Sequence, residues 1–96
     1  MTRSGLERRL LEVADRLTAV RGDLAVAEDQ LRHFSDIADE TRLRSLVSET
    51  ALADQEFQEA ERHARAMERH RDELRNEISQ LESRQDDLLD QLTAGR

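Results

Sequence analysis

The chain has 96 residues, of which 39 % are charged and 2 % aromatic, and its formal net charge is −7. This length allows one domain, residues 1–96. The acidic balance argues against direct binding to nucleic acid or to an anionic membrane, because both need a net basic face. The chain has no cysteine and therefore no disulfide or thiolate metal site.

No stretch of the chain approaches the ~18 apolar residues of a membrane span. The first residues lead into no apolar signal segment. We therefore expect a cytoplasmic protein that does not enter a membrane. The 15 basic residues are all arginine, which we interpret as the codon bias of a GC-rich bacterial genome.

The first apolar seam alternates spacings of four and three residues, which is typical of a coiled-coil helix. It predicts a helix over about 4–34, with Ser4 and Glu7 as a capping box. Gly22 lies at an outer position, where it costs ~1 kcal/mol against alanine. The seam consists of Leu6, Leu10, Val13, Leu17, Val20, Leu24, Ala27, Leu31 and Phe34.

A second start signal follows this seam. Ser35 or Asp36 is a candidate N-cap, and acidic side chains are favourable in the first turn of a helix. We therefore expect a short helix at about 36–47. Its predicted inner face holds Ile37, Leu43, Leu46 and Val47.

The second seam alternates spacings of three and four without a slip and predicts a long helix over about 51–94. Gly95 stands where a glycine commonly ends a helix. The polar seam residues Arg71 and Gln85 are typical of positions that set the register. The seam consists of Leu43, Leu46, Thr50, Ala53, Phe57, Ala60, Ala64, Met67, Arg71, Leu74, Ile78, Leu81, Gln85, Leu88 and Leu92.

Two seams in one chain fold back on each other most simply. We expect an all-α fold, an antiparallel helical hairpin of coiled-coil type with the short third helix at its tip, which assembles into a helical bundle. The preferred register places Leu6 opposite Leu92 and Phe34 opposite the small Ala64. A rival register, shifted by one heptad, places Phe34 opposite Phe57.

Site chemistry is sparse in this sequence. His63 and His70 lie two turns apart on a helix, roughly 10 Å along its axis, which is too far to hold one metal ion. Glu59 and His63 could supply two ligands, but a zinc site needs four. No phosphate loop or catalytic triad is present. We therefore expect that the protein is not an enzyme and that it binds neither a metal nor a cofactor.

Asp36, Asp39 and Glu40 cluster where the predicted hairpin turns. A hairpin with this acidic run resembles the transcription factors that insert a helical hairpin with acidic tip residues into the secondary channel of bacterial RNA polymerase. The resemblance covers the hairpin and the run, and the globular domain of those factors is missing. It implies an alternative function, a small regulator of a nucleic-acid enzyme.

Leu11, Ala14 and Leu89 lie off the seams but on the same edge of the predicted hairpin. An apolar edge beyond the seam indicates a partner helix. We therefore expect a homodimer or a helical protein partner. The leading hypothesis is a noncatalytic coiled-coil interaction or scaffold protein that docks helices.

Overall fold

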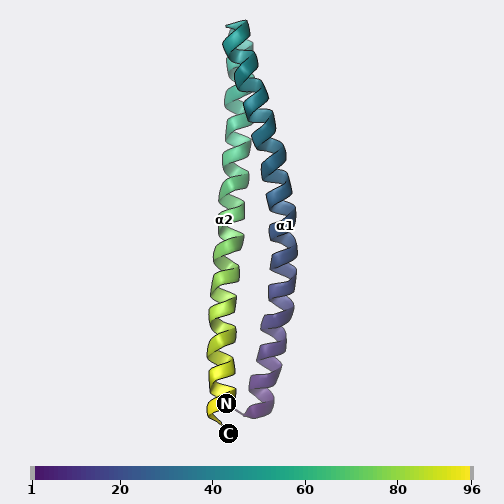
Figure 1. The fold of residues 1–96 in the computed structure, drawn as a ribbon, viewed down its shortest axis with the longest axis vertical. Coiled ribbons are helices and arrows are strands. Elements are labelled where there is room, and N and C mark those ends of the chain that lie inside the picture. Colours follow the sequence, from purple (N-terminus) through teal and green to yellow (C-terminus); the bar gives the residue numbers. More distant parts are fainter. Residues whose placement is uncertain (1, 96) are drawn as a thin grey trace. The chain divides into compact units, whose positions relative to one another are not determined.

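The computed structural model describes residues 2–95, which form two long α-helices packed as a hairpin (Figure 1). Helix α1 comprises Arg3–Ser48 and helix α2 comprises Ala51–Ala94. The predicted long helix at 51–94 is confirmed. No third helix and no strand occurs in residues 2–95, so the prediction of a short helix at 36–47 is wrong.

The first helix passes through Ser35 and Asp36 without a break. Neither residue removes a backbone donor as proline would, and each costs only a few tenths of a kcal/mol in a helix interior relative to good helix formers. The local N-cap signal is therefore too weak to end a helix whose packing continues on both sides of it.

The inner face of α1 after Phe34 follows from this continuity. At 100° per residue, the helix next turns Ile37, Ala38, Thr41 and Ser45 inward, and all four are at least partly buried. The predicted inner residues Leu43, Leu46 and Val47 are instead 65 %, 65 % and 83 % exposed. The seam of α2 accordingly begins at Ala53, which is buried.

The chain divides into two compact units, unit 1 (Met1–Leu24 with Leu74–Arg96) and unit 2 (Ala25–Glu73). In unit 1 the beginning of α1 packs against the end of α2. Leu17 and Val20 are 2 % and 0 % exposed. The apolar cluster of unit 1 consists of Leu6, Val13, Leu17 and Leu88, with Leu10, Ile78, Leu81 and Leu92 packed against it.

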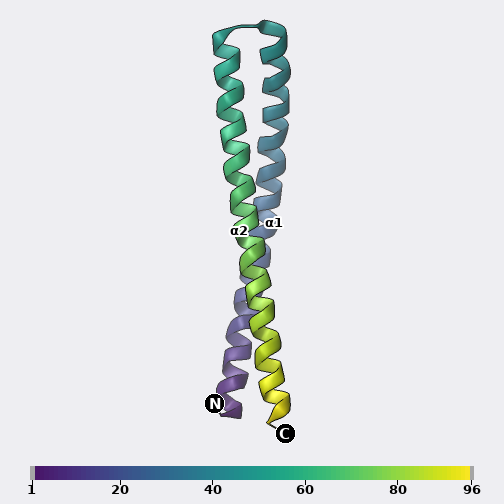
Figure 2. The same ribbon diagram turned by 90° about the vertical axis from the view of Figure 1, so that its left-hand side faces the viewer.

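In unit 2 the two helices run antiparallel on either side of the turn at 49–50 (Figure 2). Its buried apolar residues are small: Ala27, Ala53 and Ala60. The Phe34 ring lies 5.6 Å from the ring of His63, the residue that precedes the predicted partner Ala64 in the chain. The preferred register is therefore confirmed here, and the rival pairing of Phe34 with Phe57 is wrong.

Threonines cap both helices. The Oγ1 of Thr2 accepts a hydrogen bond from the Gly5 amide at 3.1 Å, so Thr2 takes the capping role predicted for Ser4. Glu7, predicted to complete the capping box, pairs with Arg3 at 3.2 Å. At the start of α2, the Oγ1 of Thr50 accepts the Ala53 amide at 3.2 Å.

The connection between the helices is short because Glu49 has a left-handed backbone, with φ at 51°. Its amide still donates to the Ser45 carbonyl at 3.1 Å, which is the geometry of a residue just past a helix end. Gly95 differs, since no described glycine has a positive φ. Its amide donates to the Gln91 carbonyl at 3.1 Å and continues the helical pattern.

Candidate functional site

An apolar groove, here called the terminal groove, lies in unit 1. It encloses about 400 Å³, and Leu11 and Leu89 on its walls are 67 % and 45 % exposed. The structure thus brings together the predicted residues Leu11, Ala14 and Leu89, which come from the beginning of α1 and the end of α2. The groove is lined by Glu7, Leu10, Leu11, Ala14, Gln85 and Leu89.

Helical geometry explains why the terminal groove is hollow and apolar. Leu11 and Leu89 each follow a seam leucine by one residue, which turns them about 100° away from the seam and toward solvent. Ala14 contributes little volume between them. The polar seam residue Gln85, which the sequence indicates as a candidate for setting the register, also lines the groove.

A charged contact joins the same two segments of unit 1. The Arg16 guanidinium donates to the Glu77 carboxylate through Nε at 3.1 Å and through a terminal nitrogen at 2.7 Å. This hydrogen bond, and then the attraction between the charges, raises the pKa of Arg16. Arg16 follows Leu11 by five residues, about 140° around the helix, so the pair leaves the terminal groove open.

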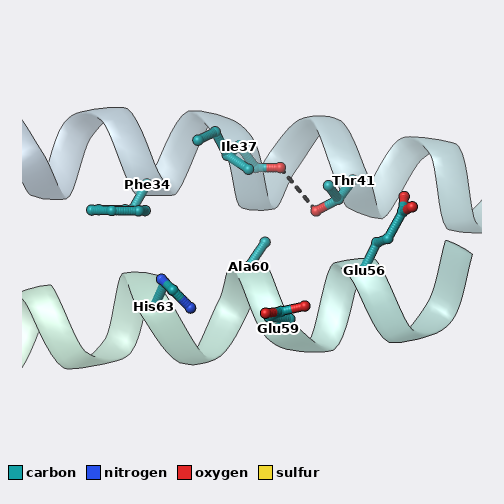
Figure 3. Close-up of a pocket in the computed structure, with 7 residues that line it drawn as sticks. All are labelled: Phe34, Ile37, Thr41, Glu56, Glu59, Ala60 and His63. Carbon is teal, nitrogen blue, oxygen red and sulfur yellow. Dashed lines mark hydrogen bonds between the residues drawn. The ribbon is translucent and has the colours of Figure 1, made fainter. Parts of the chain in front are cut away.

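A second groove, here called the Phe34 groove, lies within unit 2 and encloses about 240 Å³ (Figure 3). Phe34 projects from α1 toward α2, and Ala60 projects from α2 toward α1. The centroid of the Phe34 ring lies 5.6 Å from that of the His63 ring and 5.5 Å from that of the His33 ring, which it meets edge-on. The groove is lined by Phe34, Ile37, Thr41, Glu56, Glu59, Ala60 and His63.

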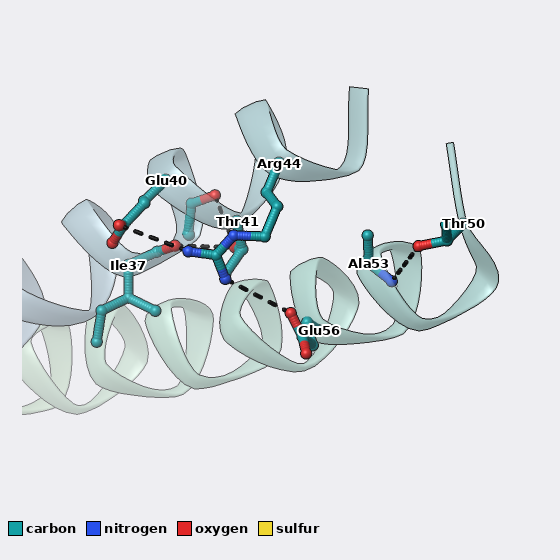
Figure 4. Close-up of polar contacts among 8 residues, drawn as sticks. Ile37, Glu40, Thr41, Arg44, Thr50, Ala53 and Glu56 are labelled. Atoms are coloured by element: carbon teal, nitrogen blue, oxygen red, sulfur yellow. Dashed lines mark hydrogen bonds and ion pairs between the residues drawn. The ribbon is translucent and has the colours of Figure 1, made fainter. Parts of the chain in front are cut away.

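Small side chains create the Phe34 groove. Thr41 is buried, and its hydroxyl donates to the Ile37 carbonyl at 2.8 Å, which satisfies its polar atom within α1 (Figure 4). Ala60 faces it with a single methyl group. Because neither residue fills the space beside the large Phe34, a hollow stays open to solvent.

The carboxylates around the Phe34 groove differ in their partners. Arg44 lies between Glu40 on its own helix and Glu56 on α2, at 3.6 Å from each (Figure 4). Glu59 has no hydrogen-bond or ion-pair partner among residues 2–95. Glu59 therefore presents an uncompensated charge beside an apolar floor. Sequence reasoning noted Glu59 and His63 only as an insufficient pair of metal ligands.

The acidic residues predicted for the tip occupy a different place. Asp36, Asp39 and Glu40 lie within α1, between nine and thirteen residues before Glu49 in the turn. Asp36 lines a separate hollow of about 290 Å³ with Arg71. The cluster is therefore a stretch of helix rather than the end of the hairpin.

Apolar side chains stand near the turn instead. Four of them are each at least 65 % exposed: Leu43, Leu46, Val47 and Leu52. Sequence reasoning placed the first three in the interior. Continuing the phase of the first seam past Phe34 by 100° per residue would have assigned them to the outer face.

Within residues 2–95, no three histidine or acidic side chains are placed to hold a metal ion. Neither α1 nor α2 contains a stretch long and apolar enough to cross a membrane. Comparisons with protein-family models, with curated proteins and with solved structures found no match.

Proposed function

We propose that this protein is a noncatalytic coiled-coil interaction or scaffold protein, and that a second copy of the chain docks in its terminal groove. The observation that carries the proposal is the pair of exposed leucines, Leu11 and Leu89, on one apolar groove. Full burial of each leucine contributes about 1.5–3 kcal/mol. A symmetric dimer would place the groove against its own copy.

The charge of unit 1 supports a second copy as the occupant. Residues 1–24 and 74–96 carry eight arginines and nine acidic side chains, a net charge of −1. A contact between two identical surfaces brings every charge near its copy, so a balanced surface avoids net repulsion. The groove itself is bordered by one carboxylate, that of Glu7, which already pairs with Arg3.

Sedimentation equilibrium on a double variant tests this proposal. Leu11→Glu/Leu89→Glu places two carboxylates in the groove, and we expect it to be a folded monomer under conditions in which the wild type dimerises. The matched control, Val26→Glu/Leu43→Glu, replaces two residues of similar exposure outside the groove and should dimerise as the wild type does. A groove variant that still dimerises, or a control that loses the dimer equally, contradicts the proposal.

The alternative function is a small regulator of a nucleic-acid enzyme, of the type that enters the RNA polymerase secondary channel. It would depend on Asp36, Asp39 and Glu40, which lie along α1 away from the turn. Because such a regulator would need these acids at the tip, we prefer the interaction function that rests on the terminal groove. A pull-down distinguishes the two. Recovery of RNA polymerase with the wild type, lost when the three acids become Asn or Gln, would favour the regulator.

A further inference from the structure

The negative charge of this protein is concentrated in unit 2. Residues 25–73 carry seven arginines and thirteen acidic side chains, a net charge of −6 out of the −7 of the whole chain. The Phe34 groove lies entirely within this unit. Its electrostatic surroundings therefore favour a positively charged occupant and oppose an anionic one.

The residues that line the Phe34 groove indicate which kind of positively charged group would fit it. Phe34, Ile37 and Ala60 supply an apolar floor, and the free Glu59 carboxylate stands at its edge (Figure 3). An arginine side chain matches both parts, because its methylene stem packs on apolar surface while its guanidinium forms forked hydrogen bonds to a carboxylate. Arginine also stacks on an aromatic face such as that of Phe34 better than lysine does.

The size of the groove agrees with a side chain rather than a free ligand. It encloses about 240 Å³, below the ~300–1,000 Å³ of typical small-molecule sites. An amphipathic helix that lays its apolar face into a hydrophobic groove is a recurring mode of recognition between proteins. We infer that the Phe34 groove binds an arginine side chain presented by a basic amphipathic helix of a partner protein.

A second copy of the chain fits this groove poorly. The two copies of unit 2 would each bring a net charge of −6 to the contact, and like charges placed face to face disfavour association. The same charge opposes an anionic lipid surface. The inferred site is independent of the proposed dimer, since the Leu11→Glu/Leu89→Glu variant leaves unit 2 unchanged.

Fluorescence anisotropy with a synthetic helical peptide tests the inference on the full chain. The probe is about 20 residues long, because shorter helices are marginal in water, and it carries leucine and arginine along one face of an alanine-rich helix. One matched peptide has lysine in place of arginine, and another has glutamate. We expect the arginine peptide to bind, the lysine peptide to bind more weakly, and the glutamate peptide not to bind.

Two variants distinguish a direct contact in the Phe34 groove from general attraction by the negative charge of unit 2. Glu59→Gln should weaken binding of the arginine peptide roughly 3- to 10-fold, the loss of one charge-assisted contact that is partly screened by solvent. Glu68→Gln removes the same charge from another exposed position of α2 in unit 2, outside the groove. It should leave the affinity nearly unchanged.

Other outcomes overturn the inference. If Glu59→Gln and Glu68→Gln weakened binding of the arginine peptide equally, the net charge of unit 2, and not a contact in the groove, would explain the affinity. Binding of the glutamate peptide as tightly as the arginine peptide would exclude the assigned chemistry, as would no binding of the arginine peptide at all. A wild-type dimer that dissociates on Ile37→Glu, in a variant that stays helical by circular dichroism, would assign the groove to a second copy instead.

Discussion

Arg16 reaches across from α1 and donates two hydrogen bonds to a single carboxylate oxygen of Glu77 on α2, at 3.1 and 2.7 Å. The contact links residues 61 positions apart in the chain. It therefore reports directly on the antiparallel pairing within unit 1. Both side chains are solvent-accessible, so the contact specifies register more than it adds stability.

Reversing the charge at one end of this pair should lower the melting temperature. Arg16→Glu places two carboxylates together and destabilises unit 1, whereas Arg16→Glu/Glu77→Arg restores the attraction. Thermal unfolding at low salt should show recovery in the double variant, and the difference should shrink at high salt because exposed charges are screened. A double variant less stable than Arg16→Glu alone and Glu77→Arg alone would contradict the pairing.

Leu17 and Leu43 should respond in opposite ways to truncation. Leu17 is 2 % exposed, so Leu17→Ala should lower the free energy of unfolding by about 2–5 kcal/mol. Leu43 is 65 % exposed, so Leu43→Ala should change it by less than ~0.5 kcal/mol. Urea denaturation measures both. A large loss for Leu43→Ala would restore the interior role that the sequence pattern suggested.

Glu49→Gly should stabilise the protein. A non-glycine residue with φ near 51° carries a left-handed backbone penalty of about 1–2 kcal/mol, which glycine avoids at a partly offsetting entropic cost. We expect a net gain of about 0.5–1 kcal/mol in the free energy of unfolding. The control Ser48→Gly, at the last residue of α1, should give no gain because Ser48 has no positive φ.

Cysteines at positions 10 and 88 test the topology in solution. Leu10 packs against the cluster that contains Leu88, and the chain has no other cysteine. Leu10→Cys/Leu88→Cys should therefore crosslink within one molecule in dilute solution, seen as a compact monomer on a non-reducing gel. Exclusive formation of crosslinks between molecules would mean that α1 and α2 do not pair within one chain.

Sequence patterns predicted the fold where one long-range signal dominated. The seam from Ala53 to Leu92 repeats without a slip, and its phase predicts α2. Pairing it with the first seam, large residues against small ones, predicts the register that brings Leu11 close to Leu89. The segment 36–47 failed because two signals competed there. The capping preference of Ser35 and Asp36 is local and weak. The helix continues because Thr41 and Ser45 face inward, and as polar residues they were not recognised as part of an apolar seam.

The Phe34 groove could not be predicted for a related reason. A hollow arises from the volumes of side chains that face one another, here Phe34 beside Thr41 and Ala60, and those volumes matter only once the register is known. The i,i+4 spacing of Glu40 and Arg44 favours their ion pair, but the contact of Arg44 with Glu56 joins the two helices and depends on the register. Spacing along α2 likewise does not indicate that Glu59 has no ion-pair partner among residues 2–95.

Sedimentation equilibrium of the wild-type chain at tens of micromolar shows whether the chain self-associates, as docking of a second copy in the terminal groove requires. We expect the mass to rise with concentration from the monomer value of 11.1 kDa toward twice that value. A mass that stays at 11.1 kDa over this range would contradict the proposed docking.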